Sequence, residues 1–221
     1  MPRKKKSSAD STALPAQLRA AERHLSRVDP VMARLIKRHG PCRLGERRRD
    51  PFHVLCSSVV SQQLSTKAAD TIAKRLELLL GAKPHLQPAD FATVTHEQLR
   101  GVGLSNAKAR WLVEIARRTH AGEFSFAALD ALDDEAAIEM LDALPGIGRW
   151  SAEMYLMFAL VRLDLYSLGD LGLRRGVNVL YNKGRPLSDK RTLKLAERWS
   201  PYRTVASWYL WRSGEETTDS W

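Results

Sequence analysis

Apolar residues recur every three or four positions along most of this chain, the spacing of helices that bury one face. No stretch alternates apolar and polar residues for long, and no Asn-Gly turn joins two apolar runs. The pattern predicts helices over residues 14–28, 31–40, 52–63, 66–81, 106–122, 135–144, 172–181, 188–200 and 202–214, with a central helix from about residue 149. The expected fold class is all-α.

Polar residues that cap helices stand in front of several of these segments. Asp and Ser or Thr side chains accept hydrogen bonds from the first free N–H groups of a helix, and proline suits its first turn. The predicted caps are Asp29 and Asp50, each followed by proline, Ser65, Thr95, Ser105, and either Asp133 or Asp134.

The two ends of the chain lack this periodicity. Residues 1–13, "MPRKKKSSADSTA", are polar and basic, so we expect a disordered arm that adds weak attraction for phosphates. One helical domain is expected over residues 14–213, followed by a tail over residues 214–221.

Two segments repeat one pattern: a helix end, a Gly-x-Gly turn and a second helix. They are "LRGVGLSNAKARWLVEIA" (99–116) and "LPGIGRWSAEMYLMFAL" (144–160). Glycines there permit positive φ and expose N–H groups at the start of the next helix, where the helix dipole favours an anion such as phosphate. An ordinary helix connection has the same signature. Pro145 and Arg149 favour phosphate binding by the second copy, whereas the first is expected to be structural.

The composition narrows the class of binding partner. There are 35 Lys and Arg against 25 Asp and Glu, a net charge of +10, which suits a polyanion such as nucleic acid, although a basic protein without such a partner is equally consistent. No apolar run reaches the roughly 18 residues of a membrane span. Cys42 and Cys56 are too few for a disulfide framework or an iron–sulfur cluster, and a reducing compartment is expected.

Four motifs in order resemble those of the helix-hairpin-helix DNA glycosylases, in particular the alkylpurine (3-methyladenine) branch. They are "VVSQQLSTKAADTI", "LPGIGRWSAEMY", "SLGDLGLRRG" and "WSPYRTVASWYLWR", and the similarity runs from about residue 15 to 213. The resemblance implies two helical lobes with a DNA-binding cleft between them. It also implies base excision repair: hydrolysis of the N-glycosidic bond of 3-methyladenine or 7-methylguanine flipped out of duplex DNA, leaving an abasic site.

The resemblance makes Asp170 the catalytic carboxylate. Breaking an N-glycosidic bond builds positive charge on the sugar, which a fixed carboxylate stabilises, and the same group can orient the attacking water. Asp170 also stands where an Asp would cap the next helix, and both roles are compatible. Asp164, the rival carboxylate, is expected to be structural.

Tryptophans supply the expected base pocket. Relatives that also cut the DNA backbone place a lysine nucleophile where this chain has Trp150, and an indole forms no imine, so a monofunctional enzyme is expected. Lys108 lies outside that position and is expected to be solvated. Alkylated purines are cationic and stack well on indoles, so Trp150 and Trp211 are the pocket candidates. Arg212 is expected to face phosphates, and core packing is expected for the following tryptophans: Trp111, Trp199 and Trp208.

The remaining site residues follow from the family's way of holding DNA. Gln63 is the expected plug that fills the gap left by the flipped base, with Gln62 and Leu64 as alternatives. Gly146, Gly148 and Arg149 are expected to contact the DNA strand, with residues 45–50 and Lys67 as further phosphate contacts or merely solvated charges. The resemblance implies no required cofactor, but a structural Na⁺ or K⁺ on three backbone carbonyls, those of Asp142, Leu144 and Ile147.

The expected partner is double-stranded DNA containing alkylated bases, bound by a monomer with no membrane association. The protein is expected in the cytoplasm, associated with the nucleoid, or in the nucleus if the source is a eukaryote. Two alternatives remain open: a non-catalytic protein that binds abasic or distorted DNA, and a bifunctional glycosylase/lyase. Asp170 and Trp150 favour the monofunctional enzyme, because a pure binding protein needs neither.

Overall fold

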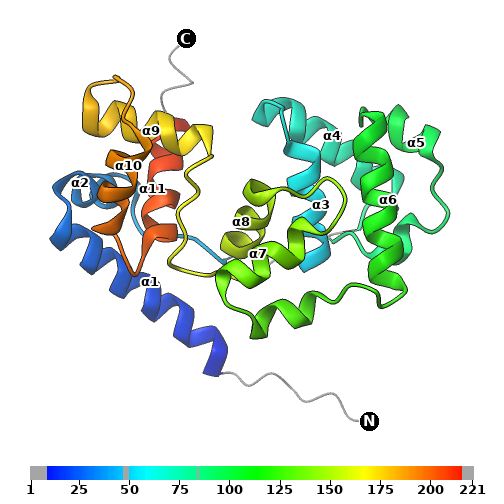
Figure 1. Ribbon diagram of the computed structural model, residues 1–221, viewed down its shortest axis with the longest axis horizontal. Helices are drawn as coiled ribbons and strands as arrows, with labels where there is room; N and C mark the ends of the chain where they lie inside the picture. Colours follow the sequence, from blue (N-terminus) through cyan, green and yellow to red (C-terminus); the bar gives the residue numbers. More distant parts are fainter. Residues whose placement is uncertain (1–8, 47–49, 84, 216–221) are drawn as a thin grey trace. The chain divides into compact units, whose positions relative to one another are not determined.

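The computed structural model describes residues 9–46, 50–83 and 85–215, and this part of the chain is helical without strands, which confirms the expected all-α class (Figure 1). The chain divides into two compact units, Met1–Arg47 with Val161–Trp221, and Arg48–Leu160. Two helical lobes are therefore present, as expected. The first unit joins segments that lie more than 100 residues apart in the sequence.

The helices of each unit are as follows. The first unit holds α1 (Ala9–Val28), α2 (Pro30–His39), α9 (Leu171–Asn182), α10 (Asp189–Glu197) and α11 (Arg203–Glu215). The second holds α3 (Pro51–Ser61), α4 (Thr66–Leu79), α5 (His96–Gly101), α6 (Asn106–His120), α7 (Asp134–Asp142) and α8 (Arg149–Phe158), with short 3-10 helices at Pro88–Phe91 and Phe126–Ala131 that the periodicity did not predict.

Helix starts agree closely with the sequence pattern. Each predicted cap accepts a hydrogen bond from the first turn of its helix, and the choice at the start of α7 falls on Asp133, which accepts from Ala136 N at 2.9 Å. Gly40 ends α2 with φ 72°, a conformation that favours glycine.

Both chain ends are more helical than predicted. The arm expected over residues 1–13 is wrong in its last part, since α1 begins at Ala9. Ala9, Ala13 and Ala16 have high helix propensity, and the helix continues through Pro15 at the cost of a hydrogen bond. The tail expected from residue 214 begins later too, because α11 reaches Glu215. Residues 1–8 and 216–221 lie outside the described part.

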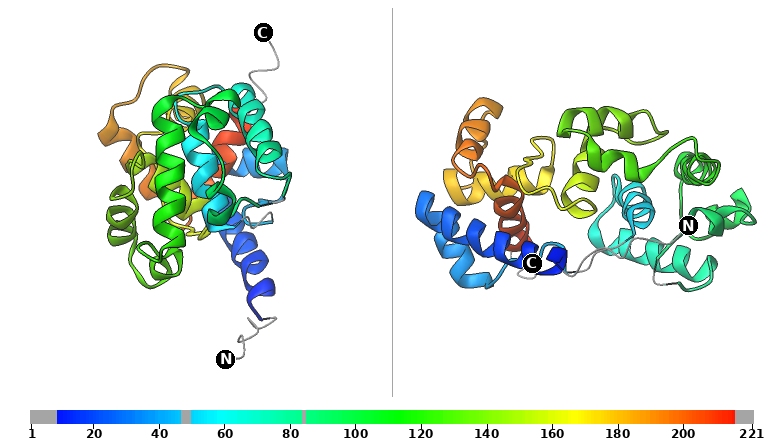
Figure 2. Two further views of the ribbon diagram at one scale, coloured as in Figure 1. Left: turned by 90° about the vertical axis from the view of Figure 1, so that its right-hand side faces the viewer. Right: turned by 90° about the horizontal axis from the view of Figure 1, so that it is seen from below.

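The core of the first unit surrounds Trp199, whose side chain is fully buried. Its indole Nε1 donates to Asp29 Oδ2 at 2.9 Å, and the hydroxyl of Tyr181 donates to the same oxygen at 2.9 Å. Asp29 Oδ1 meanwhile caps α2, so one buried carboxylate satisfies both a helix start and two core side chains. Within this unit α9 packs against α11, and α1 against α2 (Figure 2).

The second unit is organised around α3 and α8, which pack against each other. Seven consecutive residues of α8, Ser151 to Met157, are buried, which explains why this helix is apolar on nearly every side. Tyr155 stacks on Phe126 with ring centroids 5.6 Å apart. Such a helix is a rigid support for the turn that precedes it.

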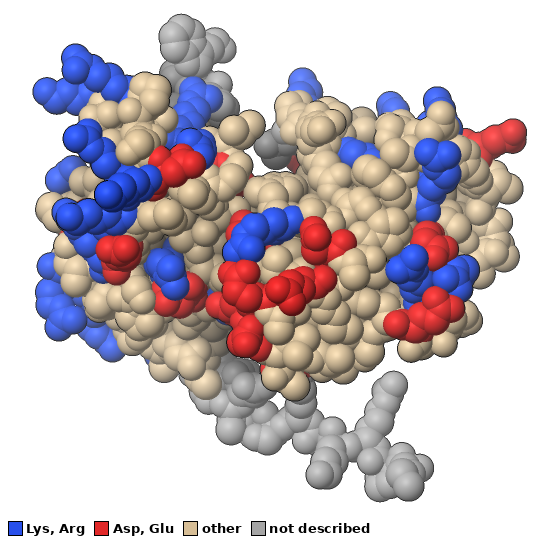
Figure 3. Space-filling model, in the orientation of Figure 1, with Lys and Arg blue, Asp and Glu red and all other residues tan. Residues whose placement is uncertain are grey.

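Charge is divided unevenly between the units. Among the described residues, the first unit has 18 Lys and Arg against 9 Asp and Glu, a net charge of +9, whereas the second has 10 against 14, a net charge of −4. Figure 3 shows the many basic side chains of the first unit and the acidic group over the second. Long-range attraction for a polyanion therefore resides mainly in the first unit.

Two further expectations can be compared with the structure. Cys42 and Cys56 are both buried free thiols. In the described part of the chain, no helix is long and apolar enough to cross a membrane.

Candidate DNA-binding hairpin and catalytic aspartate

One of the two glycines in the turn between α7 and α8 has the backbone that the sequence predicts. Gly146 has φ 75°, in the left-handed region, whereas Gly148 is extended with φ −105°. Leu144 and Ile147 are both only 4% exposed, and Ile147 N donates to Leu144 O at 3.2 Å, so the apolar pair anchors the turn from below. The glycine and the two apolar residues together hold the turn in a single shape.

Gly146 is also a point of close approach. A Cβ at this position would lie 2.1 Å from Cδ2 of Trp111 on α6, so the indole packs directly on the bare backbone. This contact supports the structural interpretation of Trp111. It also shows why the turn needs glycine twice over, for φ and for space.

Gly148 is the N-cap of α8 and has no side chain to satisfy the first N–H groups of that helix. In every other α-helix with a described N-cap, the side chain of the N-cap residue accepts a hydrogen bond from a backbone N–H of the first turn. These N-cap residues are Asp29, Asp50, Ser65, Thr95, Ser105, Asp133, Asp170 and Ser188. The first N–H groups of α8 thus have no side-chain cap at Gly148, and a helix start of this kind, with its dipole, suits a phosphate.

Arg149 opens α8 and forms two ion pairs, although its side chain is 60% exposed. Its guanidinium is bidentate to Glu135 on α7 at 2.7 and 2.9 Å, and Nε lies 3.0 Å from the buried Glu153. The hydrogen bonds that Arg149 donates to Glu135 raise the pKa of Arg149 further above its ordinary value. In this structure Arg149 fastens α8 to α7, and its predicted contact with a DNA phosphate would compete with Glu135.

The three plug candidates occupy different environments at the end of α3. The amide of Gln62 donates to Gly146 O at 2.8 Å and to Ser151 Oγ at 2.9 Å, which ties it to the hairpin. Gln63 is exposed and has φ 57°, and Leu64 is 40% exposed. Gln62 is thus engaged inside the unit, whereas Gln63 and Leu64 face solvent.

Lys108 is not the solvated residue that the sequence suggested. Its Nζ donates to Val60 O at 2.8 Å and to Gln62 O at 2.6 Å, both at the C-terminal end of α3. These contacts span 48 and 46 residues, so no local pattern predicts them. The prediction was wrong because helix periodicity indicates on which face of α6 Lys108 lies, but not that the C-terminal end of α3 packs against that face.

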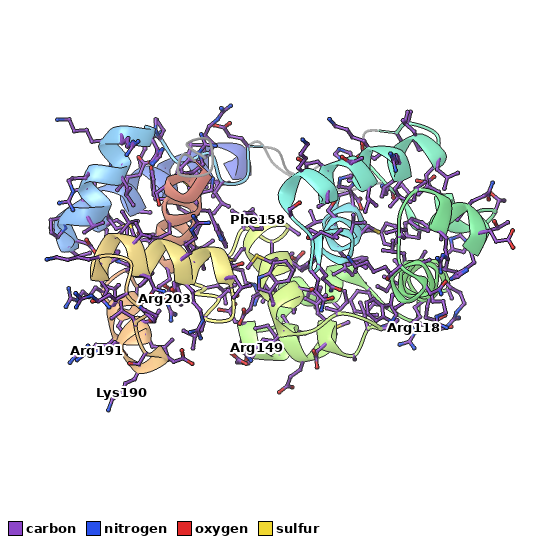
Figure 4. The ribbon with its side chains drawn as sticks, turned by 90° about the horizontal axis from the view of Figure 1, so that it is seen from above. Arg118, Arg149, Phe158, Lys190, Arg191 and Arg203 are labelled. Carbon is purple, nitrogen blue, oxygen red and sulfur yellow. The ribbon has the colours of Figure 1, made fainter. Side chains whose placement is uncertain are left out.

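Two aromatic residues of α8 remain for the base pocket. Trp150, the second residue of the helix, is half-buried. Phe158, at its last residue, is 37% exposed, and Figure 4 shows it at the opposite end of α8 from Arg149. An exposed aromatic at the end of a buried helix is a candidate stacking surface that the sequence did not reveal, because the same apolar pattern covers the whole helix.

Asp170 lies in the first unit, where it caps α9. It is 8% exposed, and its Oδ1 accepts from Leu173 N at 2.8 Å and from the indole Nε1 of Trp211 at 2.9 Å. The N-terminal dipole of α9 favours a negative charge here. The capping role is therefore present, and two donors on one oxygen fix the plane of the carboxylate.

The surroundings of Asp170 hold this geometry tightly. A Cβ at Gly172 would lie 3.1 Å from Asp170 Oδ1 and 3.1 Å from Cδ1 of Trp211, so this helical glycine makes room for the hydrogen bond. Arg174 Nε donates to Leu168 O at 3.3 Å, in the loop that leads to Asp170. The contact with Trp211 was not foreseen. It engages the edge of the indole, so the predicted stacking of a base on its face stays a prediction.

Asp164 has the structural role expected of it. Its carboxylate accepts from Arg203 Nε at 2.8 Å, from Arg203 Nη2 at 3.0 Å and from Ser200 Oγ at 2.9 Å, which ties the loop after α8 to the start of α11. Burial raises the pKa of Asp164, but the hydrogen bonds from Arg203 and Ser200 outweigh it, and the net pKa is lowered.

Two residues of α11 complete this unit. Arg212 is exposed and lies over the ring of Trp208, 5.8 Å from its centroid. Trp208 is half-buried against the core, in agreement with the packing role predicted for it.

Comparison with known proteins decides the family. The model of the HhH-GPD superfamily of base excision DNA repair proteins matches residues 56–201, about two thirds of the chain. The chain belongs to this superfamily. The match includes residues 62–64, the turn between α7 and α8, and Asp170, and membership in a DNA repair superfamily makes DNA the partner of this protein.

Individual relatives agree. DNA-3-methyladenine glycosylase 1 of Schizosaccharomyces pombe is 34% identical over 201 residues, 90% of this chain and 88% of the relative. The solved structure of the S. pombe 3-methyladenine DNA glycosylase with abasic DNA has a TM-score of 0.81 and 34% identity, and covers 89% of this chain and 97% of the other. A DNA-3-methyladenine glycosidase from Bacillus halodurans has a TM-score of 0.72 and 35% identity, with 90% of each chain covered.

Proposed function

We propose that the protein is a monofunctional DNA glycosylase that hydrolyses the N-glycosidic bond of alkylated purines. The observation that carries this proposal is Asp170: a superfamily member holds a buried carboxylate at a helix N-terminus, with its plane fixed by Leu173 N and Trp211 Nε1. A carboxylate that merely capped α9 would need the first of these hydrogen bonds only.

The chemistry follows from the leaving group. A purine alkylated at N3 or N7 is cationic, so the bond to the sugar breaks without a strong general acid. Positive charge then develops on the sugar, and a preorganised anion such as Asp170 stabilises it by about 3–4 kcal/mol, a factor of 10² to 10³ in rate. Water completes the reaction, with Asp170 as the group that orients it.

Two features support monofunctional chemistry on a cationic base. Trp150 cannot form the imine that a lyase needs. Its half-buried indole, and the partly exposed ring of Phe158, offer electron-rich faces on which a cationic purine stacks favourably. We infer that 3-methyladenine and 7-methylguanine are substrates, and that the protein acts as a monomer.

DNA would be held by the second unit, through the hairpin between α7 and α8 and through residues 62–64 after α3, here called the plug loop. The uncapped start of α8 receives a phosphate, and Gln63 or Leu64 fills the gap left by the flipped nucleotide. A Na⁺ or K⁺ ion would be coordinated by the carbonyls of Asp142, Leu144 and Ile147. Carbonyl oxygens at a helix C-terminus and in the following turn suit such an ion, and Leu144 O also accepts from Ile147 N. The ion would add positive charge beside the phosphate.

A second function, binding of abasic or distorted DNA without cleavage, is the competing proposal, because the uncapped start of α8 and the basic first unit suit it as well as they suit an enzyme. The alkylbase DNA glycosidase-like protein mag2 of S. pombe is 28% identical over 87% of this chain.

The deciding experiment measures methylated bases released from alkylated duplex DNA, resolved by chromatography, for the wild type and Asp170→Asn. Asparagine is as good an N-cap as aspartate and can still accept both hydrogen bonds, so folding should be preserved while the charge is lost. We expect release by the wild type and a fall of about a hundredfold or more in the variant, which should remain folded at the temperature of the assay.

The other outcomes are equally informative. A wild-type protein that binds abasic DNA but releases no base supports the binding protein. A covalent adduct trapped with borohydride on a lesion duplex would contradict the monofunctional assignment.

A further inference from the structure

The end of α3 is closed in an unusual way. The last carbonyls of a helix need partners, and glycine in the left-handed conformation commonly provides the turn that supplies them. Here the ammonium of Lys108, from the first turn of α6, donates to Val60 O at 2.8 Å and Gln62 O at 2.6 Å. A cation at this position also interacts favourably with the C-terminal dipole of α3.

The residue that follows is conformationally strained. Gln63 has φ 57°, in the left-handed region, which is unfavourable for a residue with a Cβ. Leu64 N donates to Ser61 O at 3.2 Å, and Ser65 then caps α4. Strain of this kind persists only where neighbouring contacts fix the backbone on both sides.

The contacts that fix the backbone before Gln63 are made by Gln62, through both its carbonyl and its side chain. Its carbonyl is held by Lys108 and its side-chain amide by Gly146 O at 2.8 Å and Ser151 Oγ at 2.9 Å. One residue thus joins the end of α3 to α6 and to the hairpin, through contacts 46 to 89 residues apart in the sequence. The loop that presents Gln63 and the turn that would hold the phosphate are a single assembly.

We propose that Lys108 and Gln62 are positioning residues that set the register between the plug loop and the hairpin, so that Gln63 enters the duplex where the hairpin grips the strand. This inference rests on the proposed function, because a plug matters only if a base is flipped. Neither residue needs to touch DNA. Burial lowers the pKa of Lys108, in keeping with an ammonium group withdrawn from water onto carbonyl oxygens.

The prediction is specific to the stacked duplex. Flipping a paired base costs unstacking and unpairing free energy. This cost is least where the duplex is already disrupted, so a misplaced plug should matter less there. The test compares single-turnover release of 7-methylguanine from a fully paired duplex with release from a duplex that has an abasic site opposite the lesion. The variants are Lys108→Met, which keeps the stem and removes the donors, and Gln62→Met, which cuts the second contact.

We expect each variant to slow release from the paired duplex about tenfold or more, the value of one hydrogen bond to a charged group, and from the disrupted duplex by less than about threefold. Lys108→Arg, which retains donors, should recover part of the rate. Lys74→Met, at an exposed lysine of α4, is the matched control and should leave both rates unchanged.

Each result decides the matter. An equal loss on both duplexes would mean a merely structural role and would overturn the proposal, as would an unchanged rate on the paired duplex. If the wild type releases no base from either duplex, the proposed function itself fails and this inference with it. The ratio of the two rates is insensitive to the fraction of folded protein, so a partly unstable variant still gives an answer.

Discussion

Replacing Trp211 with Phe removes the hydrogen bond that its indole donates to Asp170. The indole Nε1 lies 2.9 Å from Asp170 Oδ1, while Leu173 N, at 2.8 Å from the same oxygen, keeps the N-cap in place. Phenylalanine fills most of the volume and leaves an aromatic face for a base. The variant therefore separates orienting the carboxylate from stacking on the substrate.

The expected magnitude follows from the kind of bond. A hydrogen bond to a charged group contributes about 1.5–3 kcal/mol, and the smaller ring forgoes roughly 1 kcal/mol of apolar burial. The free energy of unfolding should fall by about 2–4 kcal/mol. If the bond holds the carboxylate against the reacting sugar, about 2 kcal/mol of it is lost from the transition state, a factor of roughly 30 in the single-turnover rate.

The decisive assay is a double-mutant cycle in rate. Trp211→Phe is measured alone and in the Asp170→Asn background, with enzyme in excess over a duplex carrying one 7-methylguanine and with spontaneous depurination subtracted. If Trp211 acts through the charge of Asp170, the second background should show less than about a threefold effect. Trp208→Phe, on the same helix, is the matched control and should change the rate by less than about twofold.

Two results would refute this reasoning. An equal loss in both backgrounds would mean that Trp211 contacts the base directly and does not act through Asp170. An unchanged rate in Trp211→Phe alone would mean that Leu173 N and the helix dipole suffice to orient the carboxylate.

Two further predictions concern the hairpin and the rival carboxylate. Gly146→Ala should lower the free energy of unfolding by about 2–4 kcal/mol, because φ 75° is strained for a residue with a Cβ and because that Cβ would lie 2.1 Å from Cδ2 of Trp111. A decrease of less than about 1 kcal/mol, measured by denaturant titration, would contradict this prediction. Asp164→Asn should lower stability by about 1–3 kcal/mol at pH 7 and change base release less than threefold. The pKa of Asp164 is lowered on folding, so its ionised form stabilises the fold above the carboxyl's ordinary pKa of about 4, and this stabilisation is lost as the pH falls through the folded pKa. The stability difference between the wild type and Asp164→Asn should therefore shrink in acid. A difference that does not change with pH would count against the ion pair with Arg203.

The sequence by itself determined most of the helices and identified the candidate site residues. Period-3.6 patterning and caps such as Asp29, Asp50 and Ser65 act within one or two turns, so the information is local and readable. Ordered motifs likewise singled out the hairpin and Asp170 as candidates, because a given reaction limits the residue types that can perform it. The start of α1 at Ala9 was missed, since the end of a helix depends on small differences in propensity.

Tertiary structure alone decided how these parts are held. Trp211 reaches Asp170 across 41 residues, Lys108 reaches Gln62 across 46, and Gln62 reaches Gly146 across 84. Each pair joins separate helices, and a helix pattern specifies which face is buried but not which neighbour it meets. These contacts between distant residues are therefore set by packing, which no local signal encodes.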